Sequence, residues 1–137
     1  MEHESWKIEW SEALSVGNPI IDAEHQYFLL LINDLNGAIA ERRDKREIVR
    51  CMDLLREEAE AHFAHEEQLF AERGYPNAEI HSQHHAHISD LVRQTMQQFS
   101  TEEFSAAWLD SGRAIKDLMV SHILTVDAEY TEFLNRR

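Results

Sequence analysis

Histidines and carboxylates recur at helical spacing within segments that are otherwise apolar. His62 and Glu66 are four residues apart, and so are His81 and His85. Four residues turn a helix by about 400°, so both members of each pair lie on one face, a single turn apart. Two such side chains from one helix can bind the same metal ion or two closely spaced ions, so the pattern indicates metal chemistry.

Histidine is also concentrated in one part of the chain. There are nine histidines in 137 residues, and six of them fall between positions 62 and 87. One inward-facing histidine, or one pair at this spacing, is common in proteins without a metal. Here six candidate ligands occupy apolar-face positions on separate predicted helices: His25, His62, Glu66, His81, His85 and His122. A buried carboxylate such as Glu66 needs a cation, which neutral imidazoles do not supply. Imidazole and carboxylate donors without thiolate suit iron, manganese, copper or zinc.

The first two helices that position these residues have clear limits. Asn18 followed by Pro19 is a helix-start signal, and apolar residues at spacings of three and four predict a helix over about 19–40. Asp44 with Glu47 resembles a capping box for a second helix, which should end near Arg73 before Gly74 and Pro76.

Two further helical regions follow. A third helix is predicted over about 78–98, with Ile80 on the same side as His81 and His85. Ser100 and Glu103 resemble a second capping box, which would open a last helical region. Whether that region continues unbroken past Leu124 to Leu134 is left open.

Together these elements predict an all-α fold in a single domain spanning 1–137. Four helices joined by short connections favour an antiparallel up-down-up-down four-helix bundle over 18–135, preceded by an irregular N-terminal arm at 1–17. The low counts of glycine (4) and proline (2) argue against a β-rich fold.

Composition also limits partners and location. A formal charge of -13 makes nucleic acid and membrane surfaces poor partners, and no apolar run approaches the ~18 residues that span a bilayer. The N-terminus lacks the basic and apolar regions of a secretory signal, and the single cysteine, Cys51, excludes an internal disulfide. We therefore expect a cytoplasmic protein in which Cys51 is a buried small hydrophobe.

The ordered set of motifs resembles the hemerythrin family, and its bacterial members in particular. The resemblance covers about residues 10–134 and consists of Asp22-xx-His25, His62-Phe63 with Glu66-Glu67, Gly74-Tyr75-Pro76, His81-xxx-His85 and His122-x4-Asp127. The chain departs from the family pattern at Leu118, where tryptophan is expected, and at Glu58, where an aromatic residue is usual.

The resemblance implies a centre of two iron ions. One iron would take His81, His85 and His122, and the other would take His25 and His62. Glu66 and Asp127 would bridge the irons, together with an oxo or hydroxo group from solvent. Seven donors are also too many for one ion. The five residues from His122 to Asp127 turn an ideal helix by about 500°, so this pairing requires a distorted helix or an aspartate that reaches around it.

Reversible dioxygen binding, for storage, delivery or sensing, is the function that the resemblance implies, and the protein is not expected to be an enzyme. The iron with two histidines would keep an open position for dioxygen or a small anion, in a pocket that we expect to be lined by Phe28, Leu29, Leu118 and Met119. The alternatives are a di-iron oxidase or peroxidase, or a protein that handles nitric oxide or iron. His65, His84 and His87 are expected at the surface.

Overall fold

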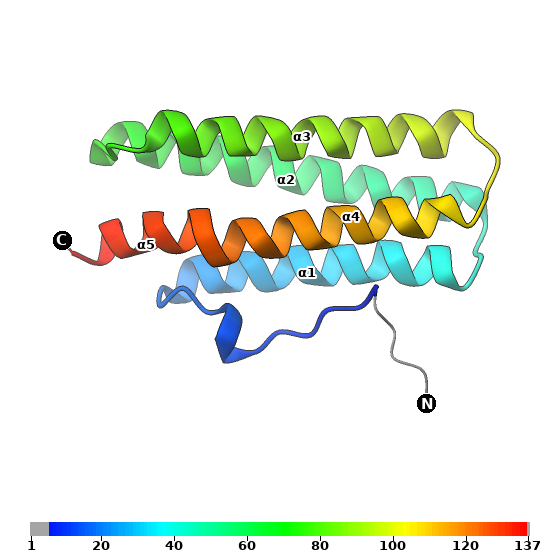
Figure 1. Cartoon of the computed structure of the whole chain (residues 1–137), viewed down its shortest axis with the longest axis horizontal. Coiled ribbons are helices and arrows are strands. Elements are labelled where there is room, and N and C mark those ends of the chain that lie inside the picture. Colours follow the sequence, from blue (N-terminus) through cyan, green and yellow to red (C-terminus); the bar gives the residue numbers. More distant parts are fainter. Residues whose placement is uncertain (1–5, 137) are drawn as a thin grey trace.

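The computed structural model describes residues 6–136, so the first five residues of the predicted arm lie outside it. Within this range the chain has no strand and forms helices α1 (Pro19–Ala40), α2 (Lys45–Arg73), α3 (Ala78–Thr101), α4 (Ala107–His122) and α5 (Ala128–Asn135). A π-helical turn at Ile123–Asp127 joins α4 to α5, so these two helices form one continuous rod (Figure 1). The predicted all-α fold is confirmed.

Consecutive rods of the bundle run in opposite directions (Figure 1). Helix α1 packs against α2 and α4, and α3 packs against the same two helices. Each rod therefore has two neighbours, which is the arrangement of an up-down-up-down four-helix bundle. No helix within residues 6–136 is both long enough and apolar enough to cross a membrane.

Local signals in the sequence explain the limits of the first two helices. The Asn18 side chain accepts hydrogen bonds from the backbone amides of Ile20 and Ile21, and Pro19 takes the first helical position. Asp44 caps α2 by accepting from the Arg46 amide, while Glu47 accepts from the Arg43 guanidinium and does not complete a capping box. Helix α2 ends at Arg73, and Gly74 caps it with a left-handed φ of 65°.

The connection between α3 and α4 differs from the prediction in two ways. Helix α3 continues to Thr101, so Ser100 lies inside it and the predicted capping box of Ser100 and Glu103 is wrong. Helix α4 begins at Ala107, whose amide donates to Ser105 Oγ at 3.3 Å. Ile80 does not share the inward face of α3, because its side chain is 57% exposed.

The described part of the N-terminal arm, residues 6–17, lies along the outside of the bundle next to α1 (Figure 1). The Asn33 side chain makes two hydrogen bonds to the backbone of Ile8. Its Oδ1 accepts from the amide at 2.9 Å, and its Nδ2 donates to the carbonyl oxygen at 2.6 Å. Asp22 accepts from the Ser15 hydroxyl at 2.6 Å and from the Val16 amide at 2.9 Å. These contacts explain how a segment with one short 3₁₀ turn keeps a defined path.

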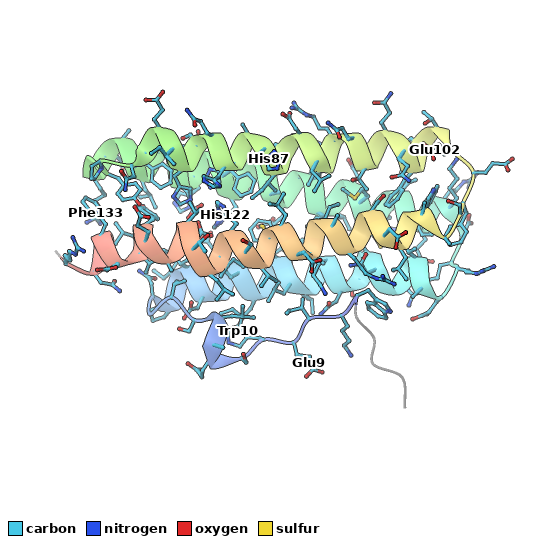
Figure 2. The ribbon with its side chains drawn as sticks, viewed as in Figure 1. Glu9, Trp10, His87, Glu102, His122 and Phe133 are labelled. Carbon is cyan, nitrogen blue, oxygen red and sulfur yellow. The ribbon has the colours of Figure 1, made fainter. Side chains whose placement is uncertain are left out.

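The core divides the bundle into two regions. Apolar side chains fill the half near the α3–α4 connection, where the buried rings of Phe99 and Trp108 stack with centroids 4.4 Å apart. The opposite half contains a smaller aromatic cluster around Phe70 and Tyr130. His122 on α4 lies toward this second half (Figure 2). Cys51 is half-buried against the larger cluster, so it is less enclosed than predicted.

Candidate metal centre

Seven side chains with metal-ligating atoms meet in the interior of the bundle. Every helical rod contributes at least one, and each residue is at most 5% exposed: His25 from α1, His62 and Glu66 from α2, His81 and His85 from α3, His122 from α4 and Asp127 from the π-helical turn. These are the seven residues that the sequence predicted. The structure brings all of them together.

The donor atoms form two groups that share one carboxylate. The larger group contains Glu66, His81, His85, His122 and Asp127, and the smaller contains His25, His62 and Asp127. Within each group the donor atoms lie within 4.8 Å of one another, close enough to surround one ion. The grouping divides the five histidines into sets of three and two.

Asp127 presents a different carboxylate oxygen to each set of histidines. Its Oδ1 lies 2.9 Å from Nε2 of His81 and 3.0 Å from Nε2 of His122. Its Oδ2 lies 2.9 Å from Nε2 of His25. A carboxylate in this position can give one oxygen to each of two neighbouring metal ions.

Glu66 also contacts histidines of both sets, but through one oxygen. Its Oε1 lies 3.1 Å from Nε2 of His85 and 3.3 Å from Nε2 of His62. Its Oε2 is buried without a hydrogen-bond partner among the described residues. A second donor oxygen is therefore available in the interior.

The π-helical turn explains how Asp127 reaches the centre. His122 ends the regular part of α4, and the next five residues, Ile123–Asp127, adopt π-helical geometry. In such a turn backbone hydrogen bonds join residues five apart, so side chains at this spacing face the same side. The distorted helix is thus the correct one of the two explanations that the sequence left open.

Two carboxylates outside the centre hold two of the imidazoles, and sequence reasoning missed both. Nδ1 of His62 lies 2.7 Å from Glu24 Oε2, and Nδ1 of His85 lies 3.1 Å from Glu67 Oε2. Glu24 is adjacent to His25 and Glu67 to Glu66, so each follows or precedes a predicted ligand along its helix. That adjacency was the available signal, but it does not say which histidine each carboxylate meets.

Aromatic rings enclose the imidazoles of the larger group. Phe63 stacks on His85 with centroids 4.0 Å apart and an interplanar angle of 11°. The ring centroids of Phe70 and Tyr130 lie 4.6 and 5.7 Å from that of His81. These rings restrict rotation of the imidazoles and reduce access of water to the donor atoms.

The neighbouring imidazoles keep the buried carboxylates ionised. Burial would raise the pKa of Glu66, but the close approach of the His62 and His85 imidazoles outweighs it and lowers that pKa to about 2. Burial likewise opposes ionisation of Asp127, and His122, His25 and His81 lower its pKa well below the usual value. Burial alone would lower the pKa of His62, yet the hydrogen bond to Glu24 and the nearby Glu66 carboxylate raise it to about 10.

The unpaired donor atoms fit a bound cation. Nε2 of His25, His62, His85 and His122 and both oxygens of Glu66 are buried without hydrogen-bond partners among the described residues. Several lie near a carboxylate, but not with hydrogen-bond geometry. Leaving such atoms unpaired in the interior is costly, and metal coordination would satisfy all of them.

Comparison with known proteins agrees with this geometry. The profile of the hemerythrin family, described as the hemerythrin HHE cation binding domain, matches residues 16–134. The chain belongs to the hemerythrin family. Because the family is one of non-haem iron proteins and the buried donors suit such a metal, the centre is a candidate iron site in this hemerythrin.

Curated relatives of this hemerythrin cover most of its length. A protein from Ralstonia nicotianae named Bacteriohemerythrin is 26% identical over 133 residues, covering 95% of this chain and 90% of the relative. A protein of the same name from Pseudomonas aeruginosa is 27% identical over 129 residues, covering 91% of this chain and 80% of the relative.

The residues predicted to line an oxygen pocket have different environments. Phe28, Leu29 and Met119 are buried, whereas Leu118 is half-buried and packs on the edge of the core. The Phe28 ring lies 5.0 Å from that of His62, which places it beside the smaller donor group. Glu58, the other departure from the hemerythrin pattern, is half-buried. His65, His84 and His87 are exposed, as predicted.

Two surface grooves border histidines of the larger donor group. One, of about 310 Å³, lies between α2 and α3 and is lined in part by His85, Phe63 and Glu67. The other, of about 180 Å³, is lined in part by His81 and Tyr75. Both grooves therefore lie beside histidines of the larger set.

Proposed function

We propose that this hemerythrin holds two iron ions and binds dioxygen reversibly at one of them, for oxygen storage, delivery or sensing in the cytoplasm. The observation that carries the proposal is the position of Asp127, with Oδ1 facing His81 and His122 and Oδ2 facing His25. One carboxylate shared between sets of three and two histidines suits a pair of ions with unequal coordination.

The ligand assignment follows from the two donor groups. His81, His85 and His122 would hold one iron, and His25 and His62 the other, with Asp127 and Glu66 between them and an oxo or hydroxo group from solvent completing the bridge. Fewer protein donors serve the second ion, so dioxygen or a small anion such as azide would bind there. Bound iron would supply the vacant coordination position and the electrons with which dioxygen can be held and released.

The chain's own residues would make this binding reversible. The five imidazoles are buried and held by aromatic packing or by outer carboxylates, which preserves the arrangement of the donors when ligand is absent. Phe28, Leu29, Met119 and the inner edge of Leu118 would present an apolar surface beside His25 and His62. An apolar wall excludes water and proton donors, and so protects a bound oxygen ligand from irreversible loss.

The direct test combines metal analysis with reversible oxygenation. The iron-loaded, reduced chain should contain close to two iron ions, change its absorption spectrum in air, and recover the original spectrum when oxygen is removed. A stoichiometry of one metal ion contradicts the dinuclear centre. Consumption of oxygen without recovery of dioxygen indicates an oxidase instead.

A further inference from the structure

Glu24 makes a short hydrogen bond to an imidazole of the smaller donor group. Nδ1 of His62 lies 2.7 Å from Glu24 Oε2, and the bond joins α1 to α2. The His62 side chain is 2% exposed and that of Glu24 is 30% exposed, so the bond is largely shielded from water.

The bond determines which nitrogen of His62 is free to bind a metal. An ionised carboxylate can only accept, so the nitrogen facing Glu24 must carry the proton. The lone pair of the neutral ring then lies on Nε2, which is buried and 3.3 Å from Glu66 Oε1. A histidine with the other tautomer would present a proton to the centre and could not coordinate.

The other imidazoles lack an equally strong anchor. Nδ1 of His25, His81 and His122 has no hydrogen-bond partner within residues 6–136. His85 has Glu67, but that bond is longer, at 3.1 Å, and the Glu67 side chain is 43% exposed. Each donor group therefore has one anchored imidazole, and the more strongly held one belongs to the smaller group.

We propose that Glu24 is a positioning residue that fixes the orientation and tautomer of His62, and that it strengthens His62 as a donor to the ion of the smaller group. The inference rests on the proposed function for the identity of that ion. A carboxylate that shares the Nδ1 proton increases electron density on Nε2, which favours metal binding and the more oxidised metal. Glu24 would therefore retain the ion at which dioxygen binds.

The test uses the full chain and Zn²⁺, which binds nitrogen and oxygen donors and is diamagnetic. In the wild type, nitrogen NMR should show His62 with a protonated Nδ1 and a metal-bound Nε2. Glu24→Ala should lower zinc affinity in one of two binding steps by about 10- to 100-fold. Glu24→Gln, which keeps the shape and can still accept a hydrogen bond, should give a smaller loss and a raised reduction potential in the iron-loaded protein.

Matched variants separate this role from general destabilisation. Glu57 is an exposed carboxylate on the same helix as His62, and Glu57→Gln should leave the zinc affinity and the reduction potential unchanged. Glu67→Gln should weaken the step that belongs to the other donor group. The proposal is overturned if Glu24→Ala and Glu24→Gln bind zinc like the wild type and leave the His62 Nδ1 proton signal unchanged. If the wild type binds only one zinc ion, the proposed dinuclear centre is contradicted. The NMR signal of the His62 Nδ1 proton would still test the role of Glu24 independently.

Discussion

His122 and Asp127 are five residues apart, yet Nε2 of the first lies 3.0 Å from Oδ1 of the second. A regular α-helix would separate these side chains by about 140° around its axis, since five residues turn it through about 500°. The π-helical turn at Ile123–Asp127 removes that difference. It acts as one extra residue accommodated in a helix that is otherwise regular on both sides.

Deletion of Thr125 should therefore preserve the centre. Without the extra residue the segment can become α-helical, and the aspartate then follows His122 by four residues, which places both on one face. Tyr130 and Thr131 of α5 would also keep their buried positions. We expect bound metal and helical content close to those of the wild type, measured by metal analysis and circular dichroism.

A deletion elsewhere in the same rod is the control. Ala114 is exposed and lies in the regular part of α4, so its removal rotates the following residues by about 100°. Met119 and His122 would leave the interior, and metal should be lost. If deletion of Thr125 lowers the metal content as much as deletion of Ala114 does, the π-helical turn does more than align Asp127 with His122.

The sequence predicted most of the fold because its signals are local. The cap at Asn18, the left-handed Gly74 and the apolar spacing on each helix depend on neighbouring residues, and each element was found within a few positions of its true limit. The connection between α3 and α4 was predicted wrongly for the same reason. Serine is a residue type that commonly caps helices, but packing of Phe99 against Trp108 extends α3 past Ser100.

The candidate site was predictable in its members but not in its supporting contacts. Inward histidines can be identified from helical spacing, and resemblance to hemerythrins added Asp127, which spacing alone would have placed on another face. The bond from Glu24 to His62 joins residues 38 positions apart, so it depends on how α1 and α2 are rotated against each other. Spacing within one helix contains no information on that rotation.

Replacing a shared carboxylate should affect both metal ions. Glu66→Ala removes oxygens that lie near histidines of both sets, so we expect the chain to lose most of both ions. His65→Ala changes the preceding residue, which is exposed, and should alter the free energy of unfolding by less than about 0.5 kcal/mol. Iron content after gel filtration measures the difference. Equal retention in the two variants would show that Glu66 is not a ligand.

The metal-free chain should have a stability maximum in mildly acidic solution. The pKa of Glu66 is lowered from 4.5 to about 2, so its contribution is present above pH 4.5 and is lost as the pH falls toward 2. The pKa of His62 is raised from 6.5 to about 10, so its contribution is complete below pH 6.5 and is lost as the pH rises through 10.

Urea unfolding of the chelator-treated chain across this pH range checks both sides of the maximum. His62→Ala should remove most of the alkaline loss, and zinc should also remove it, because the metal takes the place of the proton on Nε2. A stability that rises steadily from neutral to alkaline pH would contradict the assigned charge on His62.

Close packing between α1 and α4 predicts a second stability effect away from the metal. A Cβ at Gly112 would overlap Oδ1 of Asn36, whose side chain is fully buried and donates to the Gly112 carbonyl at 3.2 Å. Gly112→Ala should destabilise the fold by about 1–3 kcal/mol. Combining it with Asn36→Ala should recover part of that loss, because the overlap disappears. Additive losses in a urea-unfolding cycle would show that the two residues do not interact.

The proposed apolar wall beside the smaller donor group should protect the oxygenated form. Leu118 is half-buried and Met119 is buried, so a polar group is more easily accommodated at Leu118 without disturbing the core. Leu118→Gln should keep the wild-type iron content but shorten the lifetime of the oxygenated form, because an amide can bring water and proton donors to the bound ligand.

Azide provides an independent check on where that ligand binds. It should bind the oxidised protein at the ion held by His25 and His62, and Leu118→Gln should change its affinity there. Leu54→Gln, an exposed apolar residue on α2, is the matched control and should change neither the oxygenated lifetime nor the affinity for azide. If a crystal structure instead places azide on the ion held by His81, His85 and His122, the open position belongs to the other half of the centre. The proposed site of oxygen binding would then be wrong.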